Sequence, residues 1–123
     1  MGKTIPLSDL EVYKLAHEIG RMVSIVVEPW SYFHKDTLGK QFIRAADSIS
    51  LNICEGYGRF HYKENKLFCF YSRGSLFETA ECLIKAFERN LINKTDYRSL
   101  CSKLKILKTR LNNYIHSIGT EKD

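Results

Sequence analysis

The chain has 123 residues, a formal net charge of +5, 44% hydrophobic residues, two prolines and seven glycines. This length suits one compact domain with a single core, and the composition is typical neither of a disordered chain nor of a turn-rich β-protein. The sequence contains no apolar run of about 18 residues, as a membrane span needs, and no signal-peptide core. We expect one soluble, cytoplasmic domain over residues 1–123.

The charge is unevenly distributed along the chain. Residues 1–34 carry −1, residues 35–73 carry +3, residues 74–93 carry −1 and residues 94–123 carry +4. Two basic blocks of this kind permit contacts with nucleic acid or another acidic partner. Inert domains also reach this net charge, so the charge alone does not decide the function.

The first predicted helix covers about 8–28. Ser8 and Glu11 have the spacing of a capping box, and an apolar stripe from Val12 to Val26 follows. Pro29 stops the helix, and an aromatic connection over 29–35 offers Trp30 or Phe33 to close one end of the core.

The second predicted helix covers about 36–57, with Asp36 or Thr37 as its cap. Its apolar side faces a core, and opposite lies a polar stripe whose members fall within about 80° of one another at 100° per residue: Arg44, Ser48, Asn52, Glu55 and Arg59. Ser and Asn are mediocre helix formers, so helix propensity does not explain them. The polar stripe is either an interface or binding surface, or ordinary exposed surface.

The third predicted helix, about 63–90, changes its apolar face partway along. Leu67, Phe68, Phe70 and Tyr71 occupy one broad arc in the first half, and the second half uses a different arc. Gly74 lies near the change, and a glycine inside a helix costs about 1 kcal/mol relative to alanine, which usually reflects close packing of another helix. We predict that the first half is partly buried against another subunit; the alternative is a kinked helix wrapped within its own bundle.

The fourth predicted helix covers about 96–118 and has the cleanest apolar stripe, with basic residues on both flanks. Four helices of this length joined by short connections predict an all-α, up-down-up-down antiparallel four-helix bundle. No segment shows the alternation of a strand.

Catalytic chemistry is missing from the pattern. The four cysteines have no zinc-site spacing, so we interpret them as small buried residues in a reducing compartment. No histidine lies three residues after a glutamate, as a di-metal carboxylate bundle requires. We expect no enzyme activity, no metal and no cofactor; a third reading, in which Arg44, Glu55 and Arg59 act on a small anionic ligand, requires a concave pocket.

The segment RAADSISLNICEGYGR at 44–59, followed by RGSLFE at 73–78, resembles the signature of the four-helix-bundle proteins encoded by intervening sequences in bacterial 23S ribosomal RNA genes. LSDLEVYKLAHEI near the start resembles the opening helix of that family. The chain departs from the pattern at three positions, where Leu51 replaces a proline and Cys54 and Arg73 each replace an alanine.

The resemblance implies a ring-like homo-oligomer, a pentamer, of poorly defined role. The chain is also similar to accessory proteins of diversity-generating retroelements, basic pentamers thought to bind nucleic acid and a reverse transcriptase. We therefore expect the following residues at an interface: Arg44, Ser48, Asn52, Glu55, Arg59, Gly74, Ser75 and Glu78. Candidate nucleic-acid contacts are Lys40, Lys63, Lys66, Arg73, Lys105 and Lys108.

Two functions follow from this pattern. In the first, a non-enzymatic oligomer binds RNA or other nucleic acid through basic surface that assembly multiplies. In the second, the oligomer is a protein-interaction scaffold with no role for nucleic acid.

Overall fold

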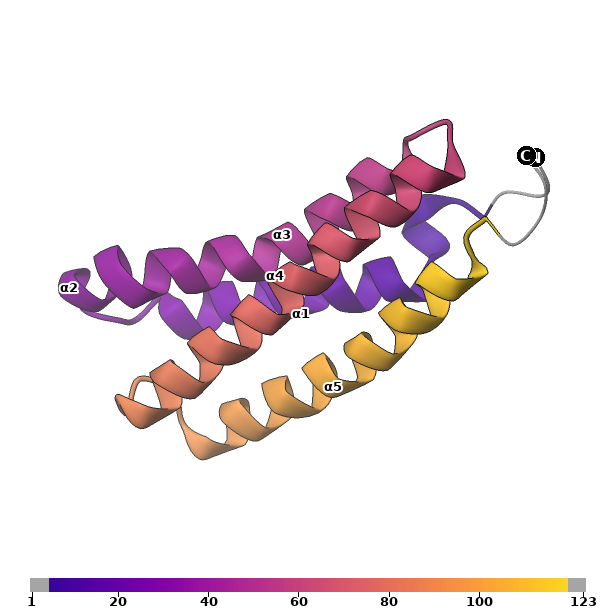
Figure 1. Cartoon of the computed structure of the whole chain (residues 1–123). Coiled ribbons are helices and arrows are strands. Elements are labelled where there is room, and N and C mark those ends of the chain that lie inside the picture. The colour runs from indigo at the N-terminus through magenta and orange to yellow at the C-terminus, as the bar shows by residue number, and fades with distance from the viewer. Residues whose placement is uncertain (1–4, 120–123) are drawn as a thin grey trace.

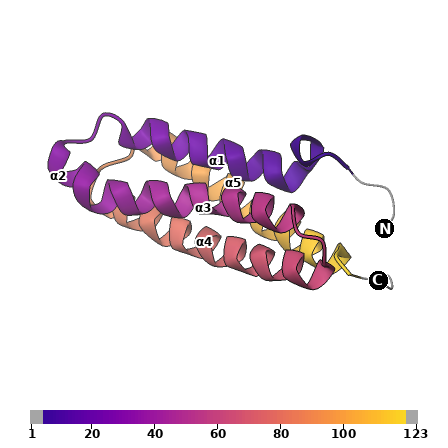
Figure 2. The ribbon, with the colours of Figure 1, turned by 90° about the horizontal axis from the view of Figure 1, so that it is seen from above.

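The computed structural model describes residues 5–119, and every regular element in that range is helical. The elements are a 3₁₀ turn η1 (Leu7–Asp9), α1 (Glu11–Val27), the short α2 (Tyr32–His34), the π-helical η2 (Lys35–Gly39), α3 (Lys40–Tyr57), α4 (Tyr62–Glu88) and α5 (Lys94–Ser117). The four long helices α1, α3, α4 and α5 alternate in direction along one bundle (Figures 1 and 2). The prediction of an all-α four-helix fold is confirmed.

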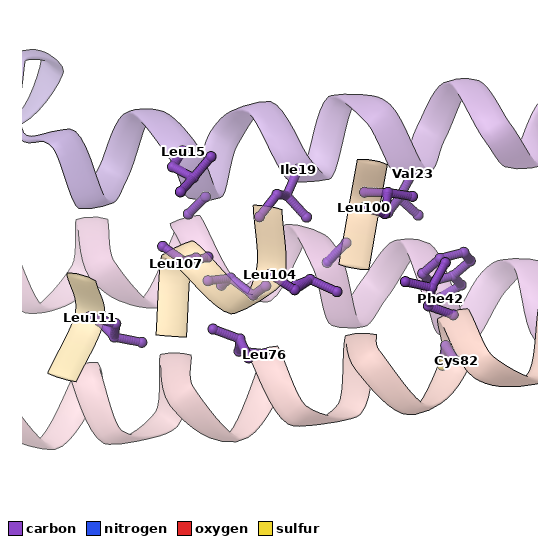
Figure 3. Close-up of a cluster of buried hydrophobic side chains, with 14 of the residues drawn as sticks. Leu15, Ile19, Val23, Phe42, Leu76, Cys82, Leu100, Leu104, Leu107 and Leu111 are labelled. Atoms are coloured by element: carbon purple, nitrogen blue, oxygen red, sulfur yellow. The ribbon is translucent and has the colours of Figure 1, made fainter. Parts of the chain in front are cut away.

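One hydrophobic core lies between the four long helices. Each of them packs against two others, so that α1 lies beside α3 and α5, and α4 lies beside α3 and α5. Leu15 and Ile19 of α1, Phe42 of α3 and Leu107 of α5 point into the shared interior (Figure 3). The periodic apolar stripes of the sequence therefore meet as the amphipathic pattern requires.

The start of α1 differs from the predicted capping box. Ser8 lies in the η1 turn, and the residue that precedes α1 is Leu10, which has an extended backbone and no side-chain cap. Leu7 and Leu10 pack against the core. Burial of these two leucines determines the conformation of the η1 turn. Ser8 and Glu11 therefore do not form a capping box, despite their spacing.

The connection after α1 is more helical than predicted. Neither Asp36 nor Thr37 caps a helix, because α2 and η2 already run from Tyr32 into α3. Leu38 and Gly39 are buried here, and a Cβ on Gly39 would lie 2.9 Å from Val27 Cγ1. Close packing of this turn against α1 holds the segment in helical form.

Trp30 closes this end of the core, whereas Phe33 is exposed. The indole Nε1 of Trp30 donates a hydrogen bond to the Leu91 carbonyl, 2.8 Å away, and so ties the first connection to the last. Asn90 adopts the left-handed conformation with φ 59°, and the Asn93 side chain caps α5 by accepting from the Asp96 N–H at 2.7 Å. The last helix thus begins at Lys94, two residues before the predicted start.

Candidate functional site

The polar stripe runs along the outer side of α3 (Lys40–Tyr57) as far as Arg59, and its hydrogen bond and ion pair join members of the stripe to one another. Asn52 Nδ2 donates to the Ser48 carbonyl at 2.9 Å, and Arg59, just beyond the helix, pairs with Glu55 at 2.6 Å. Arg44 is exposed and has no side-chain partner within residues 5–119. Within the single chain the polar stripe therefore leaves hydrogen-bonding capacity for groups outside the protomer.

α3 and α4 approach each other closely at the end where the polar stripe finishes. A Cβ on Gly56 would lie 2.7 Å from Asn65 Oδ1 and 2.9 Å from the Asn65 carbonyl oxygen. The Arg59 guanidinium lies 4.7 Å from the centre of the Phe68 ring, within cation–π range. The outer surfaces of α3 and α4 consequently form one continuous face, with the helices side by side in Figure 2.

The first half of α4 adds apolar side chains to that face. We name Leu67, Phe70, Tyr71 and Gly74 the α4 patch. Leu67 is 45%, Phe70 43% and Tyr71 51% exposed, and α4 continues unbroken through Gly74. These side chains are therefore not wrapped within their own bundle, which is the alternative that the sequence left open.

Gly74 has open space around it. Nothing among residues 5–119 lies within 4 Å of a Cβ built at this position, so no other helix in that range approaches it. Ser75 is half-buried, and its carbonyl accepts a bond from Thr79 Oγ1 at 2.8 Å, while Glu78 is exposed. The close approach that a mid-helix glycine permits is not used inside the protomer.

The six candidate nucleic-acid contacts do not form one cluster. Lys40 begins α3 and pairs with Asp36 at 3.3 Å, whereas Lys63 and Lys66 lie at the opposite end of the bundle, beside the α3–α4 connection. Phe60 in that connection is 80% exposed, and its ring meets His61 edge to face. Two lysines thus follow within six residues of an exposed aromatic ring.

Arg73 makes contacts within the protomer instead. Its guanidinium donates a hydrogen bond to Asn112 Oδ1 at 2.8 Å and lies 5.0 Å from the centre of the Phe70 ring. This bond joins α4 to α5, so Arg73 has a packing role, and its contact with nucleic acid stays a prediction.

Lys105 and Lys108 lie at a groove of about 380 Å³ between the second half of α4 and α5, which the sequence did not reveal. Tyr97, Cys101, Lys105 and Lys108 form its α5 wall. A hydrogen bond with the Cys101 thiol raises the pKa of the Tyr97 phenol. The helical spacing of the lining residues on α5 was the available signal in the sequence. Sequence alone does not show that α4 and α5 leave a groove between them here.

No three metal-ligating side chains come together within residues 5–119. Arg44, Glu55 and Arg59 lie on an outer helix face and do not line the groove. In the same range, no helix is both long enough and apolar enough to cross a lipid bilayer.

The described residues define the class of protein: a four-helix bundle with a mixed polar and apolar outer face. A profile of the family described as 23S rRNA-intervening sequence protein matches residues 8–113. The chain belongs to that family, as its resemblance predicted. A search of curated proteins finds no match.

A solved structure has the same fold. It is a protein of unknown function from the S23 ribosomal protein family of Bacteroides thetaiotaomicron, 19% identical in sequence. The match has a TM-score of 0.72 and covers 85% of this chain and 97% of that one. At this identity the likeness establishes the fold alone.

Proposed function

We propose that this protein is a non-enzymatic module that assembles into a ring-like homo-oligomer through the outer face of α3 and α4 and binds RNA through its basic surface. The observation that carries the proposal is the α4 patch, an exposed apolar surface centred on an open glycine and bordered by the polar stripe. The resemblance favours a pentamer and, through the retroelement accessory proteins, binding of nucleic acid.

The α4 patch supports assembly on energetic grounds. Burial of apolar surface contributes about 25 cal/mol per Å², and three half-exposed side chains side by side offer such surface. Gly74 costs about 1 kcal/mol relative to alanine, and no contact within the described chain offsets that cost. A helix from a second copy that crosses α4 at Gly74 would offset this cost.

The polar stripe would then fix how two copies align. Arg44 and Glu55 have opposite charges and are both exposed, with hydrogen-bonding capacity left over. Desolvation offsets much of the attraction between buried charged groups, so such residues determine register more than net stability.

Variants of the polar stripe test the assembly. Arg44→Ala and Glu55→Ala should shift the oligomer towards smaller species in light scattering, while far-UV circular dichroism keeps its helical signal because neither side chain contributes to the core. Lys14→Ala on α1, which removes an exposed charge paired only with Glu11 at 3.4 Å, is the control. Native oligomers in both stripe variants would place the interface elsewhere.

RNA binding rests on charge and on an exposed aromatic ring. Each chain contributes a net charge of +5, and assembly concentrates these charges and adds avidity. Lys63 and Lys66 follow Phe60 by three and six residues in the chain. An exposed ring and nearby basic groups suit unpaired bases, which stack on aromatic side chains while lysines contact phosphate.

A salt titration tests the RNA contact. Binding of a fluorescently labelled single-stranded RNA should weaken as salt rises, and Lys63→Gln with Lys66→Gln should reduce the slope of log K against log salt by about 1 to 1.5 per protomer, because each phosphate contact contributes about 0.7. Lys14→Gln is the matched control. Absence of binding even at low ionic strength would rule out this part of the proposal.

The second candidate is a protein-interaction scaffold, which the apolar character of the α4 patch favours. Recovery of a protein partner by pull-down after nuclease treatment, together with failure to bind RNA, would support this candidate over the first.

A further inference from the structure

The α4–α5 groove lies apart from the α4 patch, because it faces α5 and uses the second half of α4. Its floor is apolar, formed by Leu76, Leu83 and Leu104. Phe77 and Ile84 stand at its α4 edge, and both are substantially exposed. The volume of about 380 Å³ is at the lower end of the range of small-molecule sites.

Contacts between the two helices flank the groove at both ends. At one end the rings of Phe87 and Tyr97 stack with centroids 4.1 Å apart. At the other, Arg73 bonds to Asn112, and Lys108 Nζ lies 5.7 Å from the centre of the Phe77 ring. The lining runs from Leu76 to Ile84 on α4 and from Tyr97 to Lys108 on α5, which is a helix rise of about 12 to 16 Å, so the groove suits a compact ligand.

The charged side chains at the groove are both cationic. Lys105 and Lys108 line it, and no acidic side chain of residues 5–119 does. Glu81 of the neighbouring α4 turn pairs with Lys85 at 3.4 Å and lies outside the lining. An apolar floor with two ammonium groups at its edge complements a molecule with one anionic end and an apolar body.

We propose that the α4–α5 groove binds a medium-chain fatty acid, with the carboxylate at Lys105 and Lys108 and the alkyl tail on Leu76, Leu83 and Leu104. The site depends only on the packing of α4 against α5, so it is independent of the proposed RNA binding and can be tested separately.

The first test varies the length of the tail. Isothermal titration calorimetry with hexanoate, octanoate and decanoate, each below its micelle concentration, should show the dissociation constant falling about fourfold per added methylene, as burial of each CH₂ predicts. An affinity independent of chain length would overturn the placement of the tail.

The second test removes the positive charges of the two lysines and keeps side chains of similar helix propensity. Lys105→Gln together with Lys108→Gln should weaken octanoate binding at least tenfold and leave binding of neutral 1-octanol unchanged. Lys94→Gln, an exposed lysine at the start of the same helix, is the control. Equal octanoate affinity in the double variant and the wild type would overturn the role of the lysines.

The third test locates the ligand through Cys101, which lines the groove and is partly exposed. In a Cys54→Ser background, where Cys69 and Cys82 remain buried, saturating decanoate should slow alkylation of Cys101 by iodoacetamide about tenfold. An unchanged rate would overturn the proposal. Protection of Cys101 that rises with protein concentration without fatty acid, and no decanoate binding, would show that a second copy covers the groove instead.

Discussion

The four cysteines differ in what surrounds their thiols. Cys69 and Cys82 are buried on the inner side of α4, Cys101 is partly exposed, and Cys54 is exposed on α3, so the prediction that all four are buried was wrong for Cys54. Burial raises the pKa of the Cys69 thiol from 9.0 to about 11. The thiolate at this position is thus strongly disfavoured in the folded chain.

This shift predicts a loss of stability at alkaline pH. Between pH 9 and 11 the unfolded chain loses the Cys69 proton while the folded chain keeps it. The stability that the protonated Cys69 thiol contributes to the folded chain is fully present below pH 9 and is lost as the pH rises through 11. Urea unfolding across this window should show a smaller decline in Cys69→Ala than in the wild type.

The control for that experiment is Cys54→Ala, which removes an exposed thiol. It should keep the alkaline decline of the wild type. If Cys69→Ala and the wild type lose stability in parallel, the thiol of Cys69 is not the cause.

For single residues, the sequence predicted which side of each helix is apolar. It could not predict how deeply each side chain on that helix is buried. Cys54 follows Ile53, which is fully buried, yet one residue rotates the side chain by about 100° and places it on the surface. Arg73 likewise reads as a surface cation, and its bond to Asn112 depends on how α5 lies against α4.

At the scale of elements, two glycines distinguish packing within the chain from packing outside it. Gly56 allows α4 to pack closely against α3, because a Cβ there would lie 3.0 Å from Phe68 Cβ and closer still to Asn65. At Gly74 no other segment of the described chain packs closely. The same residue type therefore has two different roles in neighbouring helices.

Alanine substitutions separate these roles. Gly56→Ala should destabilise the fold by about 1 to 3 kcal/mol, since α3 and α4 must separate to fit the methyl group. Gly74→Ala should stabilise the dilute chain by up to about 1 kcal/mol through helix propensity, and should weaken assembly. Urea unfolding at low concentration and sedimentation at high concentration measure the two effects.

Equal destabilisation by both substitutions at low concentration would contradict the contrast between the glycines. Unchanged assembly in Gly74→Ala would show that no second helix crosses at this position.

The existence of the long helices followed from their periodic apolar stripes, whereas their ends depended on tertiary packing. Ser8 lost its predicted capping role because Leu7 and Leu10 turn towards the core. Asp36 and Thr37 lie within a helical segment because Leu38 and Gly39 pack against α1. Local capping patterns compete with burial, and in both places burial prevailed.

At the scale of the whole molecule, the bundle buries one core and leaves a second apolar surface open. The sequence indicated this surface through the change of apolar arc along α4, because one core covers only one side of a helix. It gave no indication of the α4–α5 groove, which depends on the separation of two helices distant in sequence. The outer face of α3 and α4 is the feature from which self-assembly is proposed.

Sedimentation equilibrium of the wild type beside Phe70→Asp tests self-assembly most directly. We expect the wild type to sediment as a multiple of the 14.3 kDa chain. Phe70→Asp, with a charge introduced into the α4 patch, should sediment as the single chain with its helical circular dichroism retained. Self-assembly through the α4 patch would be refuted by a wild type that sediments at 14.3 kDa across the micromolar range, or by a Phe70→Asp variant that keeps the wild-type assembly.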